Sequence, residues 1–178
     1  MRIVAGSRKG HRIEAPKGVV TRPTGDRVRE AVFSIVGSVE GATVLDLFAG
    51  SGAMGLEALS RGAANAEFVE RDARACRVIA ENAAKLGLAD STQVIRGDAV
   101  RALRDTATRG ARYDLVLVDA PYEEWSKLET PLGELLPEVL ADGGLVVVET
   151  SSKVEPTLPL DPVTSRRYGS ALITVFSR

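Results

Sequence analysis

The sequence has little of what builds disulfides, metal centres or membrane spans. Its single cysteine, Cys76, excludes an internal disulfide and a cysteine-rich cluster, and its single histidine, His11, excludes a multi-histidine site. No apolar run approaches the roughly 18 residues of a membrane span, and no apolar segment of signal-peptide type stands near the start. We therefore expect a cytoplasmic protein with no metal and no membrane partner.

The net charge of −1 conceals an uneven distribution along the chain. Residues 1–29 contain eight lysines or arginines and two acids, a net charge of +6, so the remainder carries −7. A basic segment on an acidic body is typical of a protein that grips a polyanion at one end. The alternative is a basic surface that is merely solvated.

Apolar strands alternate with amphipathic helices along most of the chain. The expected strands are residues 43–47, 66–70, 92–96, 113–118 and 145–149. The expected helices are residues 25–37, a helix that ends near Arg61, residues 72–86, a short helix from about Asp98, and residues 126–140. Continuous apolar strands in such an alternation predict a parallel sheet covered by helices on both faces.

The two ends of the chain differ from this pattern. Residues 162–168 and 171–177 alternate around a Gly-Ser pair, which predicts a closing antiparallel hairpin. Residues 1–15 predict two short strands around a basic turn, and Thr24 is the expected N-cap of the first helix. Because residues 1–15 hold few large apolar side chains, we expect the sheet to fold without them.

The fold class is therefore α/β, a doubly wound, mostly parallel, Rossmann-like sheet of seven strands with a C-terminal antiparallel hairpin. We divide the chain into a basic hairpin and helix over residues 1–37, which form an appendage, and a sheet domain over residues 38–178.

A glycine loop between the first strand and its helix indicates a nucleoside cofactor. Residues 50–55 match G-x-G-x-x-G, and Glu70 follows Gly50 by twenty residues, which satisfies the dinucleotide fingerprint of dehydrogenases. Asp46 separates the candidates, because a carboxylate beside the loop repels a pyrophosphate but attracts the ammonium and sulfonium of S-adenosylmethionine (AdoMet). Asp98 supplies an acceptor for an adenine amino group. We favour AdoMet; binding of a nicotinamide cofactor instead would restore the dehydrogenase interpretation.

Asp119-Ala120-Pro121-Tyr122 ends the fourth strand, at the sheet edge where this fold binds ligands. The segment resembles the (Asp/Asn)-Pro-Pro-(Tyr/Phe) motif of amino-methyltransferases, with Ala120 in place of the first proline. Together with residues 2–6, 22–24, 26–30 and 46–52, it makes the chain resemble the RsmD-like family of small-subunit ribosomal RNA guanine-N2 methyltransferases. The resemblance runs from residue 1 to the terminal hairpin.

The resemblance implies a class I AdoMet methyltransferase that acts on 16S rRNA, within the 30S subunit or an assembly intermediate, and works as a monomer. Residues 1–37 would then be an RNA-binding appendage and residues 38–178 the AdoMet-dependent methyltransferase domain. The implied catalytic residues are Asp119, Pro121 and Tyr122. The expected cofactor-binding residues are Asp46, Phe48, Ala49, Gly50, Ser51, Gly52, Glu70, Arg71, Asp98, Ala99 and Asp119. The expected RNA-binding residues are Arg2, Arg8, Lys9, Arg12, Arg22, Thr24, Arg27 and Arg29.

The residue types at the fourth strand fit this chemistry. An exocyclic base amine is a weak nucleophile, and a carboxylate that accepts its hydrogens can orient it toward a methyl donor. The ring of Tyr122 can stack on the base. Two alternatives remain open: methylation of DNA bases or of a protein glutamine, and a non-catalytic RNA-binding assembly factor. The absence of a separate target-recognition segment argues against sequence-specific DNA modification.

Overall fold

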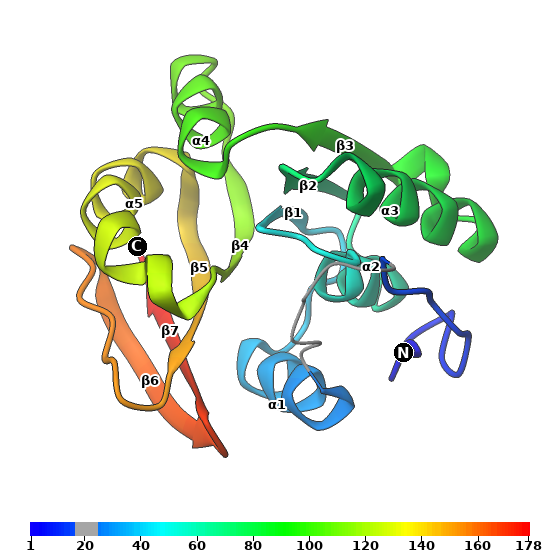
Figure 1. Ribbon diagram of the computed structural model, residues 1–178, viewed down its shortest axis with the longest axis horizontal. Helices are drawn as coiled ribbons and strands as arrows, with labels where there is room; N and C mark the ends of the chain where they lie inside the picture. The colour runs from blue at the N-terminus through cyan, green and yellow to red at the C-terminus, as the bar shows by residue number, and fades with distance from the viewer. Residues whose placement is uncertain (17–24) are drawn as a thin grey trace.

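The computed structural model describes residues 1–16 and 25–178 (Figure 1). Arg22 and Thr24 lie outside these residues. In the described part of the chain the helices are α1 (Asp26–Val36), α2 (Ala53–Ser60), α3 (Ala73–Leu86), α4 (Ala99–Thr108) and α5 (Trp125–Val139), with short 3-10 turns η1 (Ala89–Ser91) and η2 (Tyr122–Glu124). The strands are β1 (Thr43–Leu47), β2 (Asn65–Glu70), β3 (Thr92–Arg96), β4 (Tyr113–Asp119), β5 (Leu140–Ser151), β6 (Asp161–Tyr168) and β7 (Ala171–Ser177).

These strands form one sheet in the order β3-β2-β1-β4-β5-β7-β6. Pairs among β1 to β5 are parallel, whereas β7 runs antiparallel to both β5 and β6. The predicted doubly wound sheet with a closing hairpin is therefore confirmed. β5 begins at Leu140 rather than at the expected residue 145, because Leu140 already pairs with Tyr113 before a register shift.

Alternate residues of the strands enter two separate cores. On one face, α1, α2 and α3 pack against side chains such as Val44, Phe68 and Leu117. On the other face, α4 and α5 pack against side chains such as Leu45 and Val116. This alternation is what a sheet buried on both sides requires, and it leaves the carboxyl ends of the parallel strands at one edge.

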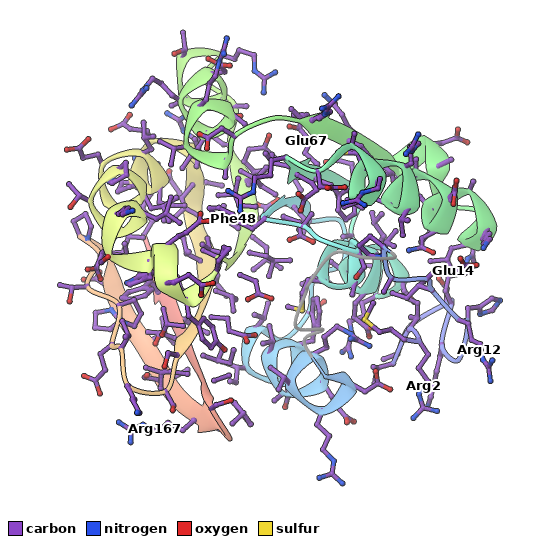
Figure 2. All side chains as sticks on the ribbon, in the orientation of Figure 1. Arg2, Arg12, Glu14, Phe48, Glu67 and Arg167 are labelled. Atoms are coloured by element: carbon purple, nitrogen blue, oxygen red, sulfur yellow. The ribbon has the colours of Figure 1, made fainter. Side chains whose placement is uncertain are left out.

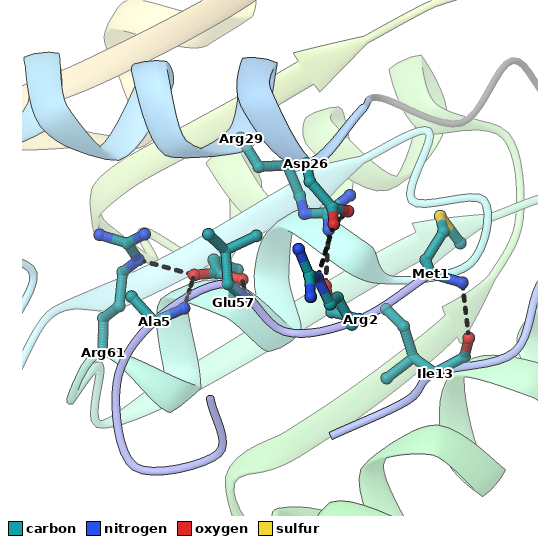
Figure 3. A network of polar contacts seen from close by, with 9 residues as sticks. Met1, Arg2, Ala5, Ile13, Asp26, Arg29, Glu57 and Arg61 are labelled. Carbon is teal, nitrogen blue, oxygen red and sulfur yellow. Dashed lines mark hydrogen bonds and ion pairs between the residues drawn. The ribbon is translucent and has the colours of Figure 1, made fainter. Parts of the chain in front are cut away.

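The N-terminal residues form a small hairpin that packs on α2. Its strands are reduced to one bridge between Arg2 and Arg12, and the backbone amides of Val4 and Ala5 donate to the buried carboxylate of Glu57 at 2.7 and 2.9 Å (Figure 3). A Cβ atom added to Gly6 would lie 1.8 Å from the Ser60 carbonyl oxygen, so the hairpin and the end of α2 are in close contact.

The apolar side chains of the hairpin belong to the core under α1 and α2. Ile3 and Ile13 are 1% and 3% exposed. These two large side chains, ten residues apart, dock the short basic hairpin on the core. Folding of the sheet without residues 1–15 stays a prediction. The hairpin and α1 share a core with the sheet, and the role of residues 1–37 as an RNA-binding appendage stays a prediction.

The start of α1 lies at Asp26. Its N-cap is Gly25, which has extended backbone angles and no side chain to accept a capping hydrogen bond. Thr24, the expected N-cap, lies outside the described residues.

Candidate cofactor and substrate site

Acidic side chains meet where the central parallel strands end. Asp46 lies in β1, Glu70 ends β2 and Asp119 ends β4, and β1 lies between the other two strands. Asp46 and Asp119 line one cavity, and both Asp119 and Glu70 act electrostatically on Asp46. The structure thus brings together three of the acids that the sequence analysis singled out.

Asp46 is the most perturbed of these acids. Its side chain is 3% exposed and accepts a hydrogen bond from the Gly55 amide at 2.9 Å. Burial raises the pKa of Asp46 to about 7; the Gly55 hydrogen bond opposes that rise, and the charges of Asp119 and Glu70 add to it. A buried carboxylate among like charges is a favourable place for a cationic ligand.

The glycine loop bends sharply beside Asp46. Phe48 has a φ of 62°, a conformation that is a genuine outlier for a bulky residue, and such outliers cluster at functional sites. Gly52 has a φ of 76° and caps α2. At Gly55 a Cβ atom would lie 2.3 Å from the Phe68 ring and 3.1 Å from the Asp46 carboxylate. Glycine there lets the helix approach the strand closely enough for the Asp46 hydrogen bond.

Glu70, expected to bind ribose hydroxyls, accepts a hydrogen bond from the glycine loop. One carboxylate oxygen accepts from the Gly50 amide at 2.9 Å and the other from the Asp72 amide at 2.8 Å. These two hydrogen bonds were not predicted from the sequence. Each carboxylate oxygen has two lone pairs, so the proposed hydrogen bonds from ribose hydroxyls remain compatible with it.

Asp98 and Arg71 are exposed, unlike the buried Asp46. Asp98 is exposed, and one of its carboxylate oxygens accepts from the Arg101 amide at 2.9 Å as the N-cap of α4. Ala99 follows it as a buried residue of the first turn. The Arg71 guanidinium pairs with Glu124 at 3.1 Å, which links the end of β2 to η2. The roles of these residues toward an adenosine moiety stay predictions.

The loop after β4 carries the substrate-side residues. Ala120 is 3% exposed and packs in the core under α5, and Pro121 caps η2. The Tyr122 hydroxyl donates to a carboxylate oxygen of Glu149 at 2.9 Å. Glu149 lies beside Asp119, because the two are register partners in β4 and β5. The cavity is lined by Val32, Asp46, Met54, Leu117, Val118, Asp119, Val147, Glu149 and Ile173.

Glu149 is the residue of this site that sequence reasoning missed. The available signal was its position at the end of the fifth apolar strand, at the same edge as Asp119. The participation of Val32 also depends on the tertiary fold, because α1 reaches the cavity from the N-terminal side of the chain.

Arg29 is withdrawn from the expected RNA contacts. Its side chain is fully buried, and its guanidinium donates to the Arg2 carbonyl at 2.6 Å and to Asp26 at 2.7 Å. Asp26 also pairs with the Arg2 side chain at 2.9 Å (Figure 3). Burial alone would raise the pKa of Asp26, but the hydrogen bonds from Arg2 and Arg29, together with their charges, lower it. Arg29 therefore fastens the hairpin to α1.

Of the other described residues expected to bind RNA, one makes a hydrogen bond to the protein backbone and the rest have exposed side chains. The Arg8 side chain donates to the Leu86 carbonyl at the end of α3, where the helix dipole favours a cation. Lys9, Arg12 and Arg27 are exposed. Arg2 and Arg12 project from the same hairpin (Figure 2), so an exposed basic surface is present on that side of the molecule.

The described residues contain no group of three or more His, Cys, Asp or Glu side chains arranged to hold a metal ion. No helix in the described ranges is both long and apolar enough to cross a membrane.

A Rossmann-like sheet of this order, with a glycine loop and acids at successive strand ends, defines the chain as an AdoMet-dependent methyltransferase. The chain belongs to the family described as Conserved hypothetical protein 95, whose model matches residues 1–177. This confirms the resemblance to the RsmD-like proteins, because Ribosomal RNA small subunit methyltransferase D of Escherichia coli K12 is 39% identical over 91% of this chain and 79% of that protein.

Curated proteins and solved structures match the chain over most of its length. YlbH of Bacillus subtilis, whose name assigns it provisionally to the rRNA methyltransferases, is 39% identical over 100% of this chain and 99% of its own. A solved hypothetical protein of Thermus thermophilus is 30% identical with a TM-score of 0.85, and the match covers 100% of this chain and 99% of that one. An RNA methyltransferase of Salinibacter ruber, solved with S-adenosylhomocysteine, shares the fold at 20% identity and a TM-score of 0.68, over 87% and 92% of the chains.

Proposed function

We propose that this protein transfers a methyl group from AdoMet to the exocyclic N2 of a guanine in 16S rRNA. The observation that carries the proposal is the cavity in which Asp46, on the cofactor side, meets Asp119, which ends the motif strand. Relatives that are 39% identical over most of the chain bear rRNA methyltransferase names, one of them for the small subunit.

The residues present fit AdoMet. Asp46 is buried, and its pKa is raised to about 7 by burial, with Asp119 and Glu70 adding to the rise. No described residue that lines the cavity is cationic. The buried Asp46 carboxylate would attract a ligand with an ammonium and a sulfonium and would repel a pyrophosphate. Asp46 and the Gly50–Gly52 backbone would hold the methionine part, Glu70 the ribose, and Asp98 the adenine amino group.

When bound, AdoMet supplies a methyl group on a positively charged sulfur, which becomes a neutral thioether when the carbon–sulfur bond breaks. Asp119 accepts a hydrogen bond from the guanine amine and orients its lone pair. A carbonyl of the loop after β4 accepts the second hydrogen, and Tyr122 stacks on the base. The amine gains a bond to the methyl carbon and gives up one proton, for which Asp119 is the nearest proposed acceptor.

The exposed basic residues give the RNA a place to bind. Lys9, Arg12 and Arg27, with Arg2 beside them, would contact phosphates that flank the target base. We expect the substrate to be an assembled 30S subunit or an assembly intermediate, and the enzyme therefore to act in the cytoplasm. We also expect the enzyme to be a monomer that needs no metal.

Methyl transfer to competing substrates tests this proposal. Purified protein with tritiated AdoMet is given 30S subunits from a strain that lacks this modification, naked 16S rRNA, or duplex DNA. We expect label in the ribosomal RNA and none in the DNA. Label in DNA alone would support the alternative function, and binding to the subunits without any transfer would support a non-catalytic assembly factor.

A further inference from the structure

We propose that Glu149 makes the site specific for guanine by accepting a hydrogen bond from its N1–H. This inference rests on the proposed function, because it assigns a recognition residue to the same base whose amine Asp119 orients.

The position of Glu149 follows from the sheet. Glu149 in β5 is the register partner of Asp119 in β4, and neighbouring strands lie about 4.8 Å apart. Ile173 in β7 is the next partner along the same row. All three residues line the cavity. The carboxylates of Asp119 and Glu149 therefore lie side by side in its wall, with Ile173 next to Glu149.

The spacing suits two adjacent donors on one edge of a base. Guanine presents N1–H and the N2 amino group next to each other, and both are donors. Adenine presents an unprotonated N1 there, and a carboxylate would repel it because an ionised acid can only accept. Asp119 and Glu149 together therefore match the edge of guanine and oppose that of adenine.

Tyr122 fixes the direction of the Glu149 carboxylate. Its hydroxyl donates to one carboxylate oxygen at 2.9 Å, and a charge-assisted hydrogen bond of this kind is stronger than a neutral one. The residue proposed to stack on the base thus also orients the acid proposed to read it. If Glu149 only anchored Tyr122, its replacement would lower activity on every base without changing the preference for guanine.

The test compares guanine with 2-aminopurine at the methylated nucleotide of reconstituted 30S subunits. 2-Aminopurine keeps an amino group at C2, but its N1 is an acceptor. The wild-type protein should prefer guanine by at least about 100-fold in kcat/KM, since a site built to accept a hydrogen bond strongly rejects a base without the donor. Glu149→Gln, whose amide can donate to N1 of 2-aminopurine, should shrink this preference at least tenfold.

Two further variants keep the result interpretable. Tyr122→Phe loses only the hydroxyl and should shrink the preference less than Glu149→Gln does. Glu138→Gln, at an exposed position of α5, should leave the preference unchanged. Calorimetry with AdoMet and a thermal melt establish that each variant is folded and binds the cofactor.

An unchanged preference in folded Glu149→Gln, with activity reduced on both bases, would overturn the inference and leave the proposed function standing. If Glu149→Gln does not fold, the preference in Tyr122→Phe decides, and a value equal to that of the wild type would overturn it. Wild-type methylation of adenine or cytosine rather than guanine would overturn the inference together with the proposed function.

Discussion

The Asp46 carboxylate accepts a hydrogen bond from the Gly55 amide at 2.9 Å, which ties the acid of β1 to the helix that the glycine loop opens. Only glycine at position 55 lets the two elements approach this closely, because a Cβ atom would overlap the Phe68 ring. The geometry keeps a carboxylate buried at the sheet edge, and the pKa of about 7 that results gives Asp46 a measurable signature.

Asp46→Asn should stabilise the ligand-free protein at pH 8 and do so less at pH 5. Burial raises the pKa of Asp46 to about 7, whereas the unfolded chain ionises this acid near pH 4. Between these values the folded state holds a proton that the unfolded state has lost, so the contribution of Asp46 to the free energy of unfolding falls as the pH rises and levels off above about 7. The full cost is on the order of a few kcal/mol. Denaturant melts across this range measure it, and a difference between the proteins that grows toward low pH would contradict it.

The same variant should lose affinity for AdoMet. The cation favours the ionised form of Asp46, so wild-type affinity should fall about tenfold for each pH unit below 7, as the proton must be released. Asp46→Asn should bind more weakly at pH 8 and lack this component of the pH dependence. Calorimetry at pH 6 and pH 8 measures both effects, and equal pH dependence in the two proteins would remove Asp46 from the cofactor site.

Glu70→Ala should weaken AdoMet binding by about 1–3 kcal/mol, because it removes both the proposed ribose contacts and the hydrogen bond to the Gly50 amide. Glu81→Ala, at an exposed position of α3, is the matched control. Calorimetry on the folded variants provides the comparison. Unchanged affinity in Glu70→Ala would mean that the loop keeps its shape without this acid.

Lys9→Glu with Arg12→Glu should weaken RNA binding without changing AdoMet affinity, because both side chains are exposed on the hairpin. Each lost phosphate contact should reduce the slope of log K against log salt by roughly 0.7–0.9. Arg77→Glu with Arg104→Glu, exposed on α3 and α4, makes the same change of net charge away from the hairpin and is the control. Binding to 30S subunits over a salt series measures the slope, and an unchanged slope would mean that the basic surface is only solvated.

Much of the architecture could be predicted because local patterns of apolar residues and glycines determine it. The apolar run over Tyr113–Asp119 and the glycine after the first strand identify a parallel sheet and its ligand edge from sequence alone. Glu149 could not be found in this way, since its partnership with Asp119 depends on strand register. An arginine in a basic segment indicates a surface residue, whereas the Arg29 guanidinium donates to Asp26 and to the Arg2 carbonyl in the interior.

The most direct test of methyl transfer to guanine N2 through Asp119 combines the loss of transfer in Asp119→Asn with the identity of the product. The wild-type protein and the variant are incubated with AdoMet and 30S subunits that lack the modification, and the rRNA is digested to nucleosides for mass spectrometry. We predict N2-methylguanosine from the wild-type protein. We predict about 100-fold or greater loss of turnover in the variant, because the proposed contact acts mainly in the transition state, with AdoMet affinity nearly retained. A different methylated nucleoside, or near-normal turnover in Asp119→Asn, would contradict the account.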